Sequence, residues 1–467
     1  MPISTDTCPL CINSTEDEEE YSWIQCSHCK QWYHTSCLKI PEFEVNTIVT
    51  YHCPNCTSSH GPSTYKRKSK RAKISIDYQA LNDGEAYAVD KSNHFQLNNF
   101  LNFKGTPNIS IINELTKDYV LESKMIKPIL IPQADLDKNG MKFPISKNKI
   151  TVDYVTECCG EDTPLEVMDV ISQQGVSPPW RLKQWRDYFN TEEQSRDRIR
   201  NVISLEISNV SKLGIEFKRP TCVEQLDLVD KIWDPLDEQP RSKVTKYCLM
   251  SVKNSFTDFH IDFGGTSVYY TICRGAKTFL MFPPTENNLQ IYESWCLEPK
   301  QNFIWYPDHS ITKNKKKIYP TEGFKVTLQP GDLFIIPSGW IHAVHTPQDS
   351  VVIGGNYLTL RDMKMQLRIN TVEKLTKVPS KFRFPMFNKV LWLSAWYYYN
   401  HQDEYLEDIG KNEDANGILD SLIEHLKKHL ELSKTNSTAK RSIPSIIGKP
   451  VIFLENLKTW KDKLHSC

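Results

Sequence analysis

Four pairs of metal-ligating side chains in the first 56 residues constrain this chain more than any other feature. Each pair has two residues between its members, and in chain order they are Cys8 and Cys11, Cys26 and Cys29, His34 and Cys37, and Cys53 and Cys56. Zn(II) binds four sulfur or nitrogen ligands in a tetrahedron, and a Cys-x2-Cys turn supplies two of them. Eight ligands therefore predict two structural zinc ions. A segment this short, with few apolar side chains, has little other means of folding.

The rest of the composition fits this interpretation. Seven of the 14 cysteines lie in this segment, and the N-terminus lacks the basic and apolar stretches of a secretion signal. In an intracellular protein, paired Cys-x2-Cys spacings indicate metal rather than disulfides. No apolar run approaches the roughly 20 residues needed to cross a bilayer. We therefore expect a cytosolic or nuclear protein with no membrane partner.

The ligand order, four cysteines, one histidine and three cysteines, resembles that of the PHD finger family, as does the Trp-Tyr pair directly before the histidine. The resemblance implies two interleaved zinc sites. One site would take Cys8, Cys11, His34 and Cys37, and the other would take Cys26, Cys29, Cys53 and Cys56. It also implies a histone tail as the partner of the finger.

Two tryptophans of this finger, Trp23 and Trp32, occupy positions where methyl-lysine readers of the PHD family carry cage aromatics. Cation–π attraction would stabilise a methylated ammonium between such rings. Thr7 stands where these readers often have a further aromatic residue. The alternative, that the two rings only pack the small core of the finger, therefore stays open.

The net charge is zero, with 57 basic and 57 acidic side chains, but neighbouring segments are polarised. Residues 1–60 hold two basic and eight acidic side chains, whereas residues 61–80 hold six basic and one acidic. The basic run Lys66–Lys73 lies in a polar stretch typical of a flexible linker, and it suits nuclear import, contact with DNA phosphates or a solvated tether. A second run, Lys313–Lys317, is expected to form a surface loop, for which contact with a histone tail or with nucleosomal DNA is the functional alternative.

From about residue 244 the chain has short strand patterns separated by glycine and proline turns. The expected strands are Tyr247–Val252, Thr266–Cys273, Thr278–Phe282, Phe324–Leu328, Leu333–Ile336 and Val351–Ile353. Many short strands with such turns predict a barrel or jelly roll. The flanking regions carry helical patterns such as Asp420–Leu432, and the apolar stretch Val390–Tyr399 is expected to form a buried helix.

Within this β region, Phe259-His260-Ile261-Asp262-Phe263 alternates apolar and polar residues. On a strand, His260 and Asp262 would point to one face. Two ligands placed in this way, completed by a distant histidine, form the 2-His-1-carboxylate triad of non-haem Fe(II) oxygenases. Three protein ligands leave three positions on iron, two for a bidentate 2-oxo acid and one for dioxygen. His342 follows a Pro-Ser-Gly-Trp turn in the later strands and is the candidate third ligand.

The segments FTDFHIDFGGTSVYY (256–270) and FIIPSGWIHAV (334–344) together resemble the JmjC family of 2-oxoglutarate oxygenases, and within it the fungal subgroup that demethylates lysine 36 of histone H3. NVISLEIS, KYCLMSV, GGNYL and FRFPMF extend the similarity over about residues 175–390. The resemblance implies a chain of mixed α and β structure. Its core would be a double-stranded β-helix, the cupin-like jelly roll, with helical flanking segments.

We expect five regions along the chain. They are a PHD-type finger at 4–58, a basic linker at 59–80, an N-terminal flanking region at 81–208, the oxygenase domain at 209–376 and a mostly helical region at 377–467.

The JmjC resemblance also implies the roles of individual residues. Its iron ligands would be His260, Asp262 and His342, and Lys277 would pair with the distal carboxylate of 2-oxoglutarate. The family pattern further nominates three residues of the co-substrate pocket, Asn201, Thr257 and Tyr270. Strict alternation would put Thr257 on the face opposite His260, and a β-bulge between them would remove this conflict.

The implied reaction is hydroxylation of a lysine N-methyl group, which then leaves as formaldehyde. The expected substrate is mono- or dimethylated lysine 36 of histone H3 in nucleosomes, and the expected location is the nucleus. Two alternatives remain. A JmjC protein hydroxylase would use the same iron and co-substrate residues, whereas a chromatin reader with an inactive oxygenase fold would have no need for a complete triad.

Overall fold

The computed structural model describes residues 8–10, 23–35, 37–38, 40, 45, 48–65, 93–176, 178–210, 212–233, 241–410 and 414–464. Three features of the sequence, Thr7, Cys11 and the basic run Lys66–Lys73, lie outside the described residues. None of the described helices is long and apolar enough to cross a membrane.

The described residues of the N-terminal finger include two small hairpins and the short helix α2. The first hairpin pairs β1 (Trp23–Gln25) with β2 (Trp32–His34), and the second pairs β3 (Ile48–Thr50) with β4 (Thr64–Tyr65). Helix α2 (Pro54–His60) follows the last Cys-x2-Cys turn, with proline in its first turn, where the missing N–H costs nothing.

Two long antiparallel strands, β14 (Ser267–Phe282) and β19 (Ile341–Tyr357), form the central ribbon of the β core. The predicted separate strands Thr266–Cys273 and Thr278–Phe282 are therefore two parts of β14. The register between β14 and β19 shifts three times between Ile272 and Thr278, and such bulges bend a ribbon. At this bend Gly275 has a φ of +73°, and a Cβ there would lie 2.1 Å from the carbonyl oxygen of Asp349, so the position requires glycine.

Each half of the bent ribbon pairs with strands of its own. In the first half, β14 pairs with β18 (Leu333–Ile336), while β19 pairs with β12 (Tyr247–Ser251). In the second half, β14 pairs with β17 (Phe324–Leu328), while β19 pairs with β13 (Phe256–His260).

Apolar side chains from both halves meet in one buried cluster, so the two sheets face each other. This arrangement, together with the helical and finger regions around it, confirms the predicted fold class, a cupin-like jelly roll within a mixed α and β chain.

The first half continues outward on both sides into strands from the N-terminal flanking region. Beyond β18 lie β6 (Ile129–Ile131) and β5 (Ser110–Ile111), and beyond β12 lie β11 (Arg200–Glu206), β8 (Met168–Asp169) and β9 (Gln174–Gly175). A separate pair joins β7 (Pro164–Leu165) to β10 (Trp180–Arg181). Between the finger and the C-terminal region, the described residues form the α-helices α4 (Leu97–Asn102), α5 (Lys117–Ser123), α6 (Val152–Cys159), α7 (Leu182–Phe189), α8 (Leu213–Glu216), α9 (Thr221–Leu226), α10 (Leu228–Ile232) and α11 (Glu286–Cys296).

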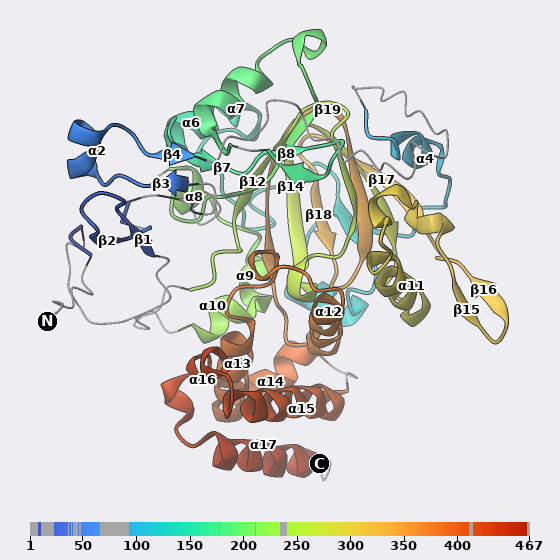
Figure 1. Ribbon diagram of the computed structural model, residues 1–467. Coiled ribbons are helices and arrows are strands. Elements are labelled where there is room, and N and C mark those ends of the chain that lie inside the picture. Colours follow the sequence, from blue (N-terminus) through green and yellow to red (C-terminus); the bar gives the residue numbers. More distant parts are fainter. Residues whose placement is uncertain are drawn as a thin grey trace, which may run out of the picture.

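The C-terminal helices gather at one end of the β core, at the bottom of Figure 1. They are α12 (Met363–Leu375), α13 (Phe387–Asn400), α14 (Gln402–Ile409), α15 (Ala415–Ser433), α16 (Ser437–Arg441) and α17 (Pro450–Leu464). The predicted helices at Val390–Tyr399 and Asp420–Leu432 are confirmed as parts of α13 and α15. Buried Asp408 of α14 accepts hydrogen bonds from Lys117 of α5 and Tyr398 of α13, both at 2.7 Å, and from Lys231 of α10, and so joins these helices to the flanking region.

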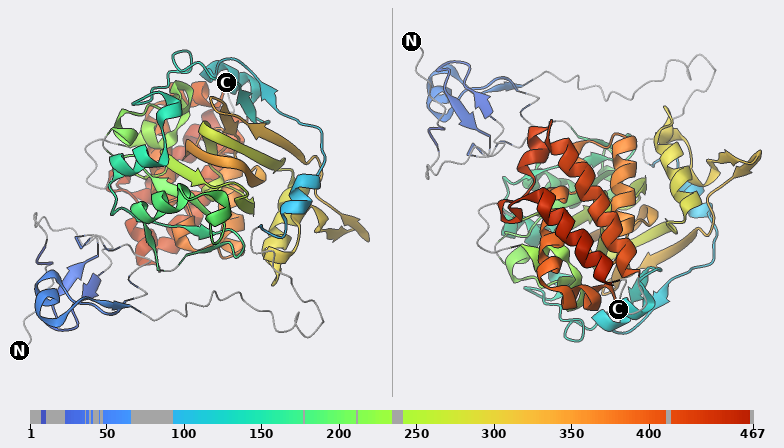
Figure 2. Two further views of the ribbon diagram at one scale, coloured as in Figure 1. Left: turned by 90° about the horizontal axis from the view of Figure 1, so that it is seen from above. Right: turned by 90° about the horizontal axis from the view of Figure 1, so that it is seen from below.

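The expectation of a loop at Lys313–Lys317 is wrong. This run belongs to a two-stranded hairpin, β15 (Ile311–Lys313) and β16 (Lys316–Ile318), that projects from the body of the molecule (Figures 1 and 2). The two turn residues, Asn314 and Lys315, have φ values of 50° and 63°. Positive φ at both positions gives the tight turn whose twist matches that of a hairpin. The sequence concealed this turn because Lys occupies a position where glycine is usual.

Candidate functional site

His260, Asp262 and His342 converge on one point inside the β core. Their potential ligand atoms all lie within 4.8 Å of one another. His342 Nε2 is 3.8 Å from Asp262 Oδ2, and the two imidazole centroids are 4.3 Å apart. His260 is the last residue of β13 and His342 lies in β19. The strand stops before Asp262, which begins the short turn Phe263–Gly265, so a turn rather than strand alternation places this carboxylate.

The hydrogen bonds of both histidines orient their Nε2 atoms toward this point. Nδ1 of His260 lies 2.8 Å from the carbonyl oxygen of Asp258, and Nδ1 of His342 lies 3.1 Å from that of Trp340. A carbonyl only accepts, so in each ring Nδ1 carries the proton and donates. The lone pair then lies on Nε2, which is the form that binds a metal ion.

Burial also keeps this site ready for a cation. It lowers the pKa of His342 to about 4, with the neighbouring His260 acting in the same direction, so His342 stays neutral near pH 7. Asn356 Nδ2 lies 3.4 Å from Asp262 Oδ1 and 2.8 Å from Thr266 Oγ1, which leaves Asp262 Oδ2 turned toward His342. Two imidazole nitrogens and one carboxylate oxygen around a single point are a donor set that fits Fe(II).

Lys277 lies in β14 and is only 3% exposed. Its Nζ donates to Ser251 Oγ at 2.6 Å and to Thr346 Oγ1 at 2.8 Å, and no carboxylate of the described residues forms an ion pair with it. Burial lowers its pKa to about 7. A buried ammonium bonded only to hydroxyl groups is poorly compensated, so the site suits an anionic ligand.

The three residues that only the family pattern nominated for the co-substrate pocket, Asn201, Thr257 and Tyr270, also lie inside the core. Asn201 Nδ2 donates to Thr257 Oγ1 at 3.3 Å, and Asn201 Oδ1 accepts from Ser251 at 2.5 Å, so both join the polar network of Lys277. Between Thr257 and His260, three steps along β13 match two along β19. This is the bulge that the sequence required for the two residues to share a face. Tyr270 is buried against Phe279, and burial together with the nearby charge of Asp262 raises its pKa, so it keeps its proton.

The sequence interpretation missed three residues that hold these groups. Ser251 and Thr346 solvate the Lys277 ammonium, and Asn356 supports Asp262. A signal for Thr346 existed, since it is four residues after His342 and alternation on β19 puts both on the inward face. Ser251 and Asn356 lay within segments that carried the JmjC resemblance, but only the fold shows what they touch.

In the finger, the described ligands form two clusters, Cys26, Cys29, Cys53 and Cys56 in one and Cys8, His34 and Cys37 in the other. This is the interleaved grouping that the PHD resemblance implied. The sulfur atoms of Cys29 and Cys53 are 3.8 Å apart. A tetrahedron with Zn–S bonds near 2.3 Å has edges of about 3.8 Å, whereas a disulfide has a bond of about 2.05 Å. The four-cysteine cluster therefore fits zinc.

Trp23 and Trp32 lie on the same face of the first hairpin, as diagonal neighbours. The ring of Trp23 contacts that of His34 edge-on, with centroids 3.9 Å apart, so it packs against a candidate zinc ligand. Trp32 is 44% exposed. One ring thus supports the finger while the other is available to a partner.

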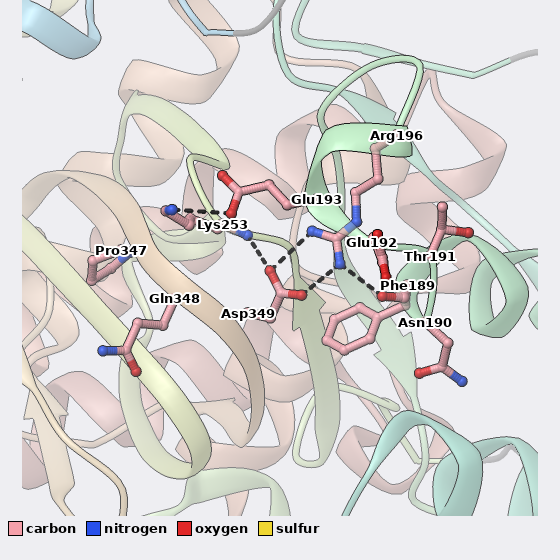
Figure 3. A pocket seen from close by; sticks show the side chains of 10 residues that line it. All are labelled: Phe189, Asn190, Thr191, Glu192, Glu193, Arg196, Lys253, Pro347, Gln348 and Asp349. Atoms are coloured by element: carbon pink, nitrogen blue, oxygen red, sulfur yellow. Dashed lines mark hydrogen bonds and ion pairs between the residues drawn. The ribbon is translucent and has the colours of Figure 1, made fainter.

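A hollow of about 620 Å³ lies at the outer rim of the β core, apart from these groups (Figure 3). Across it Arg196 donates to both oxygens of Asp349 at 3.1 and 2.6 Å, and the backbone N–H of Lys253 donates to the same carboxylate at 2.6 Å. None of the expected site residues lines this hollow. Because Arg196 and Asp349 already pair with each other, we assign this hollow a structural role and no ligand.

Comparisons with known families match three parts of the chain. A PHD-finger matches residues 8–56, a cupin-like domain matches residues 169–362, and a Jumonji helical domain matches residues 361–458.

Several fungal proteins are similar along almost their whole length, and each is named JmjC domain-containing histone demethylation protein 1. That of Candida albicans is 70% identical, over 100% of this chain and 99% of its own. That of Debaryomyces hansenii is 53% identical, over 98% and 99%. That of Saccharomyces cerevisiae is 37% identical, over 92% of both chains. The chain described here, in which a PHD finger precedes a cupin-like core and a Jumonji helical domain, belongs to this family of JmjC proteins.

Proposed function

We propose that this protein is an Fe(II)- and 2-oxoglutarate-dependent demethylase of a lysine in histone H3, with mono- and dimethylated lysine 36 as its substrate. The observation that carries the proposal is the combination in one β core of a three-ligand cluster, His260, Asp262 and His342, with the buried cation Lys277. Histone demethylation is also the activity in the names of its relatives.

Each residue has a distinct part in this proposal. His260, Asp262 and His342 would hold iron, with the Nδ1 hydrogen bonds fixing both imidazoles and Asn356 fixing the carboxylate. Lys277 would hold the distal carboxylate of 2-oxoglutarate, and Asn201, Thr257 and Tyr270 would line the remainder of its pocket. Fixed positions matter here because two reactants must meet in one geometry.

Bound iron would supply the activation of dioxygen. The overall reaction converts dioxygen, 2-oxoglutarate and an N-methyl group into succinate, carbon dioxide, formaldehyde and an amine with one methyl group fewer. The chain itself would bind and orient the reactants, and buried Phe279, whose ring centroid is 5.8 Å from that of His342, would help to exclude water from the site.

The finger would hold two structural zinc ions and bring the enzyme to histone tails in the nucleus. Exposed Trp32, beside Trp23 on the same face of the hairpin, is the candidate contact for a methylated lysine. The acidic balance of residues 1–60 suits a basic tail.

Mass spectrometry of methylated histone H3 peptides, incubated with the full chain, Fe(II) and 2-oxoglutarate, tests this proposal. We expect peptides methylated at lysine 36 to lose methyl groups, with equal yields of formaldehyde and succinate. A peptide that gains an oxygen atom while no formaldehyde is released would instead identify a hydroxylase. Absence of succinate from an iron-loaded protein would identify a reader without turnover.

A further inference from the structure

The β15–β16 hairpin presents a cluster of lysines on a firmly attached support. At its base, Ile311 and Ile318 are cross-strand partners and pack against the buried cluster of Trp295, Trp305 and Tyr306. Lys313 Nζ donates to Asn287 Oδ1 of α11 at 2.6 Å. The base of the hairpin is thus held to the body, while its tip projects into solvent (Figures 1 and 2).

Three lysines of the tip, Lys315, Lys316 and Lys317, are exposed. No carboxylate of the described residues forms an ion pair with any of them. The strand register places Lys316 opposite Lys313 on one face and Lys317 opposite Thr312 on the other, while Lys315 occupies the turn. Positive charge therefore extends over the tip and both faces of the ribbon.

This arrangement works against the stability of the hairpin. Like charges directly across an antiparallel pair are destabilising, and Lys313 and Lys316 are such a pair. Lys315 has a φ of 63°, where glycine would be adopted without strain. A charge pattern that opposes its own local structure suggests stabilisation by an anionic partner.

We propose that the tip of the β15–β16 hairpin binds the phosphate backbone of double-stranded DNA. Lysine binds phosphates as a point charge, and Lys315, Lys316 and Lys317 place such charges on the turn and on both faces of the ribbon, where the phosphates on either side of a groove can meet them. A two-stranded ribbon can also enter or straddle a groove of the duplex. This DNA-binding site is separate from the oxygenase pocket and does not rest on the proposed demethylase activity.

The test measures binding of the full chain to a short DNA duplex of arbitrary sequence, by fluorescence anisotropy over a range of salt concentrations. The test variant replaces Lys315, Lys316 and Lys317 with Gln. The matched control also replaces three lysines with Gln and so removes the same charge. Its lysines, Lys427, Lys440 and Lys458, are exposed on the C-terminal helices. Both variants keep the linker run Lys66–Lys73, and thermal unfolding checks that both remain folded.

We expect the hairpin variant to bind DNA at least about tenfold more weakly than the control, with a log–log salt slope shallower by about 2 to 3, since each phosphate contact contributes roughly 0.9. A variant with Arg at the same three positions should keep the affinity. Equal affinities of the hairpin and control variants would refute the proposal. The lysines would then serve to prevent the exposed strand edge from pairing with another chain. Displacement of DNA from the wild-type hairpin by polyglutamate at equal charge concentration would also overturn it, in favour of an acidic protein partner.

Discussion

At the scale of single residues, the choice between His342 and His345 as a metal ligand depends on the face of β19 that each occupies. His342 points into the core beside His260, whereas His345 is cross-strand to Phe256 and lies on the other face, with its ring 5.8 Å from that of Phe100. We predict that His342→Ala abolishes iron binding and turnover and that His345→Ala retains substantial activity. Iron content and succinate yield of the purified variants provide the measurement, and the reverse ranking would overturn the assignment.

Lys277 is the residue on which co-substrate binding is expected to depend. Lys277→Met keeps most of the apolar stem and removes the charge that would hold the distal carboxylate. We predict that the affinity for 2-oxoglutarate falls at least about tenfold, which corresponds to roughly 1.4 kcal/mol. Iron content should change little, because Lys277 contacts Ser251 and Thr346 and none of the three iron-ligand candidates. Unchanged affinity would mean that another group holds the carboxylate.

The lowered pKa of Lys277 predicts how this affinity depends on pH. Burial brings the pKa to about 7 in the free protein, so below that pH the ammonium is already present. Above it the amine is neutral, and binding of a carboxylate must take up a proton. The affinity should therefore fall by up to about tenfold for each pH unit above that value. Calorimetry in buffers of different ionisation enthalpy measures the proton uptake. The Lys277→Met variant should show none, and uptake by that variant would contradict the assignment.

The sequence could predict the parts of the site that depend on local patterns, and it could not predict the parts that depend on contacts between distant residues. Spacing identified His260 and Asp262 as a ligand pair, although a turn rather than strand alternation places Asp262. The family pattern selected His342, because alternation alone does not separate it from His345. Alternation failed at Thr257, since a bulge depends on the partner strand and leaves no local signal. The contacts of Ser251 and Asn356 join residues distant in the chain, and only the folded core brings them together.

At the scale of elements, β17 and β18 have the predicted bounds because glycine or proline ends each of them. The same rule divided β14 wrongly, since Gly275 bends the strand without ending it. In sequence, a glycine that ends a strand and a glycine that accommodates a bulge are indistinguishable. The partner strand decides between them, through the approach of the Asp349 carbonyl to Gly275.

Gly275 provides a test of this bend. We predict that Gly275→Ala destabilises the oxygenase core, because its Cβ would meet the Asp349 carbonyl oxygen at 2.1 Å in addition to the strain of a positive φ. Gly160→Ala is the matched control, since Gly160 has a φ of +91° but its nearest neighbour would lie 3.8 Å away. Urea unfolding should place the Gly275 variant at least about 1 kcal/mol below the control. Equal stabilities would show that the ribbon can relax at the bend.

At the scale of the whole molecule, the finger and the oxygenase have separate hydrophobic cores. The buried cluster of the finger comprises Ile24, Tyr33 and Tyr51 with four cysteines, and within the described residues none of the other clusters includes a residue of the finger. Three apolar side chains bury too little surface to offset the conformational entropy of the segment. We therefore expect the finger to draw its stability from metal ligation and the β core to draw its stability from apolar packing.

This difference predicts an uncoupled response to the loss of one finger ligand. Cys26 is fully buried in the four-cysteine cluster, and its Sγ accepts from the backbone N–H of Cys53, so Cys26→Ser removes a ligand and the contact that orients its turn. Since zinc supplies on the order of 10 kcal/mol or more to such a module, the finger should unfold while the jelly roll and C-terminal helices stay folded. Hydrogen exchange of the full chain measures both regions at once, with zinc content expected to fall from two ions per chain. Cys158→Ser, at a half-buried cysteine outside the finger, is the control and should leave the zinc content and finger protection unchanged. A Cys26→Ser chain with a protected, zinc-free finger would show that the module folds without its metal.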